Sequence, residues 1–144
     1  MSRTPDQLAE AVARRMLSQE GAGAAWGLEL EAAREGYARV AMVVRPDMTN
    51  GHGIAHGGMI FALADSAFAY ACNSRNLGTV AQHASITFVS AAQVGERLVA
   101  EATERALAGR SGVYDITVSA GERTVAVFQG LSRTLGGPII QDSE

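Results

Sequence analysis

The stretch from Gly57 to Asn73 constrains the fold of this chain more than any other segment. Read as a helix, it carries apolar side chains around nearly its whole circumference and is rich in alanine. Such a helix is normally buried on all sides. It would be about 25 Å long, at 1.5 Å per residue. This is too short to cross a bilayer, and Asp65 and Ser66 interrupt the apolar run. We therefore expect a central helix over residues 57–73 that the rest of the chain wraps.

The segments around this helix are typical of β-strands. Apolar and polar residues alternate from Tyr37 to Arg45, as in a half-buried strand. Short turn signals separate the later segments, so we expect antiparallel neighbours. The sequence predicts an α+β fold, one antiparallel sheet of about five or six strands around one central buried helix. Besides residues 37–45, the expected strands are Trp26–Leu30 as a short edge strand, Thr79–Val89, Arg97–Ala108, Val113–Ala120 and Thr124–Leu135.

The segment 1–20 is expected to form an amphipathic helix outside this core. Leu8, Val12 and Met16 recur at helical spacing within residues 5–19. Residues 21–25 combine glycine and alanine and are interpreted as a linker. A chain of 144 residues with one core is expected to form a single domain, 1–144.

Charge and cysteine content narrow the function classes. All 12 basic residues are arginine, against 15 acidic residues and a net charge of −3, so the chain lacks a basic footprint for nucleic acid. Cys72 is the only cysteine, which excludes an internal disulfide framework and favours a reducing compartment. The first twenty residues lack the apolar core of a secretory signal. We expect a cytoplasmic protein that binds neither nucleic acid nor a membrane.

Asp65 is the residue of greatest chemical interest. A carboxylate within an apolar helix costs several kcal/mol to bury unless it is paired or hydrogen-bonded. One interpretation is structural: Asp65 lies on a partly wet face or anchors a loop. The other is functional: Asp65 is a general base or nucleophile whose pKa is set by apolar surroundings.

His56, Gly57 and Gly58 stand where this helix begins. The first backbone N–H groups of a helix lack intrahelical partners, and the helix dipole favours negative charge there. Because glycine has no Cβ, a carbonyl oxygen can approach these amides closely, and one such donor is worth about 3–4 kcal/mol to a developing oxyanion. The structural alternative is a glycine pair needed only for close packing. Asn50 and His52 precede this entry on a glycine-rich loop.

We expect neither a metal nor a cofactor. The histidines, His52, His56 and His83, do not share one helix face, so they lack the spacing of a zinc site. Gly57 and Asp65 are eight residues apart, about 12 Å along a helix. That separation is too large for both to touch one carbonyl group, so joint action requires two subunits. A buried helix and long exposed strand edges also favour a two-fold dimer with two equivalent sites.

The run from Asn50 to Asn73, NGHGIAHGGMIFALADSAFAYACN, resembles the hotdog-fold thioesterases, and specifically their phenylacetic acid degradation (PaaI-type) branch. The resemblance extends over roughly residues 36–137 and includes Gly112–Ile116, Val125–Gly130 and the Gly136-Gly137 pair. It implies an acyl-CoA thioesterase in which the helix lies inside a curved antiparallel sheet. The implied assembly is a homodimer, pairing into a tetramer, with each active site shared between subunits.

The resemblance also implies residue roles. Asp65 would activate water or attack the thioester carbonyl, and the Gly57 amide, contributed by the other subunit, would polarise that carbonyl. His56 would lie near the thioester, and Asn50 would point toward the nucleophile or its water. Gly58 and Ser66 would contact the substrate. The substrate implied is phenylacetyl-CoA or a ring-hydroxylated or related aryl-acyl-CoA.

Two other functions remain open at this point. One is a hotdog-fold dehydratase acting on hydroxyacyl thioesters, although the proline-rich histidine motif of those enzymes is missing. The other is a non-catalytic acyl-CoA-binding module. Thr87 and Ser90-Ala91 stand where relatives often carry an acidic residue and a basic residue with proline. Arginines must then supply the cations for CoA phosphates, with Arg75 and Arg110 as candidates.

Overall fold

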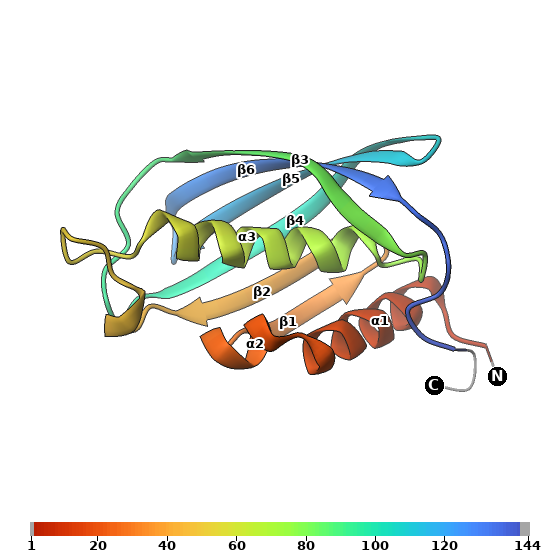
Figure 1. Ribbon diagram of the computed structural model, residues 1–144, viewed down its shortest axis with the longest axis horizontal. Helices are drawn as coiled ribbons and strands as arrows, with labels where there is room; N and C mark the ends of the chain where they lie inside the picture. The colour runs from red at the N-terminus through yellow and green to blue at the C-terminus, as the bar shows by residue number, and fades with distance from the viewer. Residues whose placement is uncertain (1, 142–144) are drawn as a thin grey trace.

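The computed structural model of the protein describes residues 2–141. One antiparallel sheet of six strands curves around a long helix, α3 (Gly57–Cys72), as Figure 1 shows. This confirms the expected α+β architecture, the hotdog fold. The order across the sheet is β1-β2-β4-β5-β6-β3. The strands are β1 (Glu29–Arg34), β2 (Tyr37–Val43), β3 (Thr79–Phe88), β4 (Arg97–Ala108), β5 (Ser111–Ala120) and β6 (Arg123–Thr134).

The core lies between α3 and the concave face of the sheet. Strand alternation directs every second side chain toward the helix, as expected from the sequence for β2. Phe68 of α3 packs against Phe128 and Tyr114, with ring centroids 6.0 and 5.6 Å away. Gly130 of β6 lies under the same ring, and this position leaves no room for a side chain. The buried strand residues include Ala38, Val40, Met42, Leu98, Ala100, Ala102, Tyr114, Ile116 and Val118.

Helix α3 begins at Gly57 and ends at Cys72, one residue before the expected end, with Asn73 as its C-cap. The Asn73 side chain turns back to Thr79: its Oδ1 accepts from the Thr79 N–H at 2.9 Å, and its Nδ2 donates to the Thr79 carbonyl at 3.0 Å. These bonds fix the chain direction from α3 into β3. None of the described helices is long and apolar enough to span a membrane.

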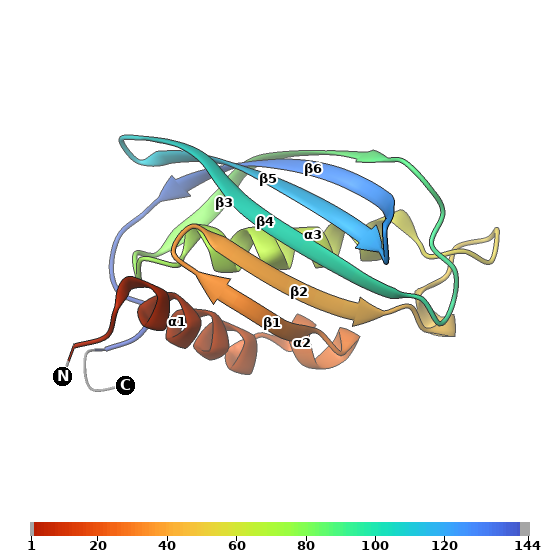
Figure 2. The ribbon, with the colours of Figure 1, turned by 180° about the vertical axis from the view of Figure 1, so that it is seen from behind.

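The amino-terminal region contains more helix than expected. Helix α1 (Pro5–Gln19) starts with a Thr4/Gln7 capping box and packs beside β1, as seen from behind in Figure 2. The predicted linker over residues 21–25 was wrong, because it forms helix α2 (Gly21–Trp26). Alanine is a strong helix former, and Gly27 ends this helix at a φ of 64°. The edge strand consequently starts at Glu29 rather than Trp26.

The expectation that β3 would neighbour β4 was also wrong. The chain does turn at Gly95, where φ is 90°, but residues 89–96 lead to β4, which pairs with β2 and not with β3. Strand β3 instead pairs with β6 and forms the far edge of the sheet. Short connections do join β4 to β5 and β5 to β6 as antiparallel neighbours.

Candidate active site

The loop before α3 is held rigidly against the body of the protein. A short 3-10 helix, η1 (Pro46–Met48), follows β2, and its Met48 carbonyl accepts the His56 N–H at 2.7 Å. The Ala55 N–H donates to the Ala92 carbonyl at 2.8 Å. Thr49 and Ala55 form a bridge that closes the loop. These bonds place the amino-terminal end of α3 in a defined position.

His56 caps α3 and leaves one backbone donor free. Its Nδ1 accepts the Gly58 N–H at 2.9 Å, so the neutral imidazole carries its proton on Nε2 and can donate from there. This bond occupies the Gly58 amide, which was expected to be available to a carbonyl oxygen. Among residues 2–141 the Gly57 N–H has no acceptor. The expected pair of oxyanion donors is therefore reduced to Gly57.

Asn50 lies in the same loop and organises it. Its Oδ1 accepts the His52 N–H at 2.9 Å and the Ile54 N–H at 3.4 Å. Its own N–H donates to the Ile54 carbonyl at 2.8 Å. The Asn50 Nδ2 group has no acceptor within the described residues, so it remains available as a donor.

Asp65 lies half-buried near the middle of α3. Burial raises the pKa of its carboxyl group above the ordinary value of 3.8. No side chain or backbone N–H of residues 2–141 forms a hydrogen bond or ion pair with it. Asp65 is thus a partly desolvated carboxylate with no partner in the part of the chain that the structure describes. This geometry argues against the loop-anchor interpretation.

Asp65 belongs to a stripe of α3 that the sheet covers only in part. Gly58, Ala62 and Ala69 share this side of the helix with Asp65 at intervals of three or four residues, and Gly58 is exposed. Ser66 adjoins Asp65, is half-buried, and has no side-chain hydrogen bond to the described residues. The stripe therefore presents small side chains, one carboxylate and one hydroxyl to whatever packs against it.

The two main candidates do not meet within one chain. Gly57 stands at the first turn of α3 and Asp65 more than two turns further on, about 12 Å along the axis. The helix is continuous between them. One chain therefore presents a free backbone N–H in one place and a carboxylate in another.

Strand β3 brings an aromatic residue to the entry of α3 that was not expected from the sequence. A Cβ built on Gly57 would lie 2.9 Å from Cζ of Phe88, the last residue of β3. The ring therefore fills the space beside Gly57. Phe88 resembles any inward-facing strand residue in the sequence, so only the position of the strand edge identifies it.

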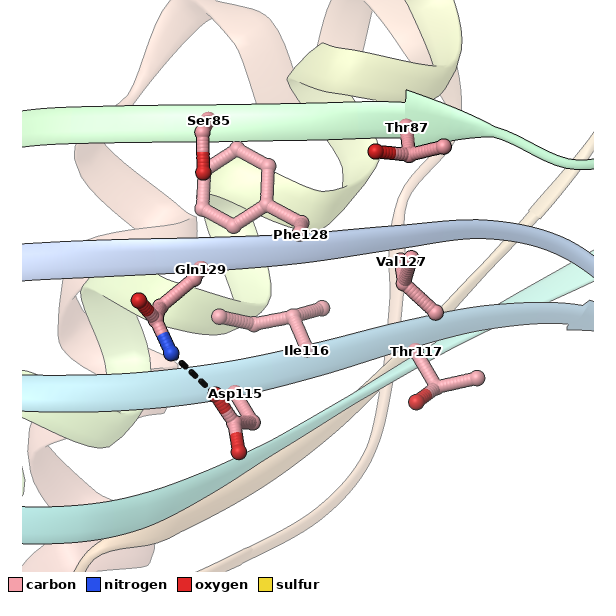
Figure 3. A pocket seen from close by; sticks show the side chains of 8 residues that line it. All are labelled: Ser85, Thr87, Asp115, Ile116, Thr117, Val127, Phe128 and Gln129. Atoms are coloured by element: carbon pink, nitrogen blue, oxygen red, sulfur yellow. Dashed lines mark hydrogen bonds between the residues drawn. The ribbon is translucent and has the colours of Figure 1, made fainter.

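A hollow of about 410 Å³ lies elsewhere, on the outer face of the sheet (Figure 3). There the Gln129 Nε2 donates to the Asp115 carboxylate at 3.0 Å. Neither Asp65 nor Gly57 borders this hollow. It is therefore separate from the candidate active site. Its lining is Ser85, Thr87, Asp115, Ile116, Thr117, Val127, Phe128 and Gln129.

The two arginines considered for CoA phosphates differ in their surroundings. Arg75 forms a bidentate ion pair with Glu104 at 2.7 and 3.0 Å and a second pair with Glu35. Arg75 lowers the pKa of Glu104, which also accepts from the Tyr114 hydroxyl. These contacts give Arg75 a structural role. The Arg110 side chain has no ion pair with the described residues.

Within residues 2–141, no three His, Cys, Asp or Glu side chains gather as they would around a metal ion. Cys72 is buried, and burial raises the pKa of its thiol to about 12. A thiol in that state is a poor nucleophile at neutral pH. The chemistry available at this site is therefore that of a carboxylate, an imidazole and a backbone amide.

Comparisons with known proteins agree with this chemistry. The model of the thioesterase superfamily matches residues 52–127, which include the loop, α3 and β3 to β6 in part. The acyl-coenzyme A thioesterase PaaI of Escherichia coli (strain K12) is 42% identical over 128 residues, which are 88% of this chain and 91% of that protein. The solved structure of E. coli PaaI, from the phenylacetic acid degradation operon, superposes with a TM-score of 0.91 at 39% identity, covering 94% of this chain and 99% of that one.

A more distant structure adds a ligand. A hypothetical thioesterase of Streptococcus pneumoniae, solved with coenzyme A, superposes with a TM-score of 0.74 at 25% identity and covers 77% of this chain and 90% of that one. The match to the superfamily model spans more than half of the 144 residues. The protein belongs to the thioesterase superfamily and is a thioester hydrolase.

Proposed function

We propose that this protein hydrolyses aryl-acyl-CoA thioesters, with phenylacetyl-CoA or its ring-hydroxylated derivatives as substrates, to the free acid and CoA. The observation that carries the proposal is that α3 presents two groups without partners among the described residues. One is the partly desolvated carboxylate of Asp65, and the other is the Gly57 N–H at the start of the helix. The E. coli relative is an acyl-coenzyme A thioesterase from a phenylacetic acid degradation operon, which supports this substrate class.

In this mechanism Asp65 acts as the general base. Burial raises the pKa of this carboxyl group, so the carboxylate is a stronger base than a solvated aspartate. The carboxylate takes a proton from a water molecule as the water oxygen bonds to the thioester carbonyl carbon. The carbonyl oxygen becomes an oxyanion that accepts the Gly57 N–H. When the C–S bond breaks, CoA leaves as a thiol after receiving the proton held by Asp65.

Other residues around the loop support these steps. The His56 Nε2–H points away from the capped amide and donates to the substrate near the thioester. The free Nδ2 group of Asn50 orients the attacking water. Gly58 allows close approach beside His56, and Ser66 adds a hydroxyl next to Asp65.

A second copy of the chain completes the site in this proposal. The stripe of small residues on α3 and the unpaired edge of β3 lie side by side, and the apolar residues Val80, Phe88 and Val89 along and just beyond that edge are about half exposed. A two-fold dimer through this region buries both features and brings Asp65 of one copy toward Gly57 of the other. We further propose that such dimers pair into a tetramer and that the enzyme works in the cytoplasm, in keeping with its single free cysteine.

Release of free thiol from a panel of CoA esters tests the function. The panel comprises phenylacetyl-, hydroxyphenylacetyl-, benzoyl-, butyryl-, palmitoyl- and β-hydroxybutyryl-CoA, assayed with wild type and Asp65→Asn. We expect the arylacetyl esters to be preferred and kcat to fall at least about 100-fold in Asp65→Asn, with the circular dichroism spectrum unchanged.

Three results would contradict the proposal. Near-normal turnover by Asp65→Asn would remove Asp65 from the mechanism. Tight binding of CoA esters without thiol release would indicate a non-catalytic binding module. Loss of water from the β-hydroxyacyl ester, without hydrolysis, would indicate a dehydratase.

A further inference from the structure

Phe88 combines an inward orientation with high exposure. Strand β3 directs Ala84, Ile86 and Phe88 toward α3, because residues at intervals of two share one face of a strand. Ala84 and Ile86 pack against the core, but Phe88 is 52% exposed. The exposed part of Phe88 therefore faces the open region beside α3, which the proposed dimer would enclose together with the site.

The ring lies beside Gly57, the residue whose backbone N–H has no acceptor among residues 2–141. A Cβ on Gly57 would lie 2.9, 3.3 and 3.5 Å from Cζ, Cε1 and Cε2 of Phe88. Cα–Cβ bonds on a helix tilt toward its amino-terminal end, which is also the direction of the free N–H groups. The tip of the ring therefore borders the space in front of the Gly57 amide.

A thioester bound at the Gly57 amide would lie close to this ring. In the proposed complex the thioester carbonyl oxygen accepts a hydrogen bond from the Gly57 N–H. The aryl or alkyl part of the substrate is bonded to the same carbonyl carbon, so it also lies close to Gly57. The neighbouring polar group, the His56 imidazole, is held in place by the Gly58 N–H. Phe88 thus presents a large apolar surface beside the bound carbonyl. A side chain at position 57 would displace the Phe88 ring.

We propose that Phe88 is a specificity-determining residue: its exposed ring face contacts the acyl group bound at Gly57 and favours flat aryl groups over linear aliphatic ones. Aromatic rings attract each other in offset or edge-to-face arrangements beyond their simple burial, whereas an aliphatic chain gains only ordinary contact. This inference rests on the proposed hydrolysis of acyl-CoA and adds a source for its acyl preference.

The test compares kcat/KM for phenylacetyl-CoA and butyryl-CoA in wild type and Phe88→Leu. Leucine keeps an apolar side chain and removes the ring. We expect the phenylacetyl to butyryl ratio to fall about three- to tenfold, the range of an aromatic pair. The matched control is Val94→Ala, an exposed apolar residue in the connection from β3 to β4, which should leave the ratio unchanged.

A second arm tests the contact with Gly57 directly. Gly57→Ala should displace the Phe88 ring, and shortening that ring in Gly57→Ala/Phe88→Leu should relieve the clash. We expect the two substitutions to be non-additive, with the double variant more active on butyryl-CoA than the product of the single effects. Circular dichroism checks folding, and Phe88→Met replaces Phe88→Leu if the leucine variant does not fold.

The outcomes separate this inference from the function on which it rests. An active wild type whose ester ratio changes less than twofold in Phe88→Leu overturns the inference alone. Equal losses for both esters assign Phe88 a purely structural role and also overturn it. A wild type that releases no thiol from any ester overturns the proposed function and this inference with it.

Discussion

Asp65 is kept in its partly buried position at a cost in stability. Below pH 3.8 the carboxyl group is protonated in both the folded and the unfolded chain, and burial carries no charge penalty. As the pH rises, the unfolded chain releases this proton first, because the folded pKa is raised. Stability therefore falls through the interval between the two pKa values and stays lower at neutral pH.

Asp65→Asn should consequently stabilise the fold at pH 7. We expect a rise in Tm of about 2–4 °C, equivalent to about 1 kcal/mol, which is typical when an active-site group is neutralised. The gain should vanish below about pH 3.8, as measured by thermal melts across pH. Asp47→Asn serves as control, because Arg45 lowers the pKa of Asp47 and no gain is expected there. A lower Tm for Asp65→Asn at pH 7 would contradict the desolvation of Asp65.

The Gly57 N–H can be removed without breaking the helix. Gly57 is the first residue of α3, a position where proline is favoured, and His56 has the extended backbone (φ −64°, ψ 135°) that a following proline requires. Gly57→Pro should lower kcat about 100- to 1000-fold, as for other lost oxyanion donors.

The matched control for this substitution is Gly57→Ala, which adds a Cβ against Phe88 but keeps the N–H. If both variants lose the same activity in steady-state assays, crowding against Phe88 explains the loss, and the N–H is not a donor in the reaction.

At this scale the sequence identifies residues that are unusual for their context. A carboxylate in an apolar helix and a glycine pair at its start stand out without a structure, and both lie where expected. The occupation of the Gly58 amide by His56 depends on a side-chain rotamer. The approach of Phe88 to Gly57 depends on two segments thirty residues apart. Neither contact has a local sequence signal.

Among the elements, α3 and β6 pack closely where the Phe68 ring of α3 lies over Gly130 of β6. A Cβ on Gly130 would lie 2.6 Å from Cε2 and Cζ of Phe68, a ring that is itself locked between Phe128 and Tyr114. Gly130→Ala should therefore overpack the core and cost about 1–3 kcal/mol, measured by urea unfolding.

Gly21→Ala is the control for this prediction. It lies in a helix with nothing within 4 Å of the new Cβ, so alanine should leave stability unchanged or raise it by up to about 1 kcal/mol. An equal effect of the two substitutions would show that the Phe68 ring yields freely.

The helices and strands that depend on local sequence were predicted well, and the features that depend on distant segments were not. Hydrophobic periodicity is local, and it located α3, β2 and the four later strands to within a few residues. The prediction of a linker over residues 21–25 was wrong because alanine favours a helix and glycine disfavours it. Local propensity therefore does not decide the structure there, and contact with the rest of the fold does. The place of β3 at the far edge depends on long-range pairing with β6, which turn signals do not encode.

In the whole molecule, the proposed division of each site between two copies predicts how mixtures of variants behave. Asp65→Asn and Gly57→Pro are each expected to be nearly inactive alone. After subunit exchange, a hybrid dimer has one site with both Asp65 and Gly57 intact and one site with neither. An equimolar mixture should therefore recover about one quarter of the wild-type activity.

Mass spectrometry of intact complexes verifies that hybrids have formed. Activity no higher than the mean of the two variants, in the presence of hybrids, would place each site within a single chain. Mixtures of each variant with wild type serve as the reference for the rate and extent of subunit exchange.

The position of β3 at the sheet edge has a consequence for the order of folding. Among the described residues its one strand partner is β6, which begins 35 residues after β3 ends and is the last of the six strands to be synthesised. During synthesis β3 therefore has no sheet to join until Thr134 has emerged, and loop closure of this length delays its docking further. Phe88, which lies beside Gly57, is then among the last residues to reach its place in the fold. A nascent or truncated chain that lacks β6 would therefore hold α3 with this side open.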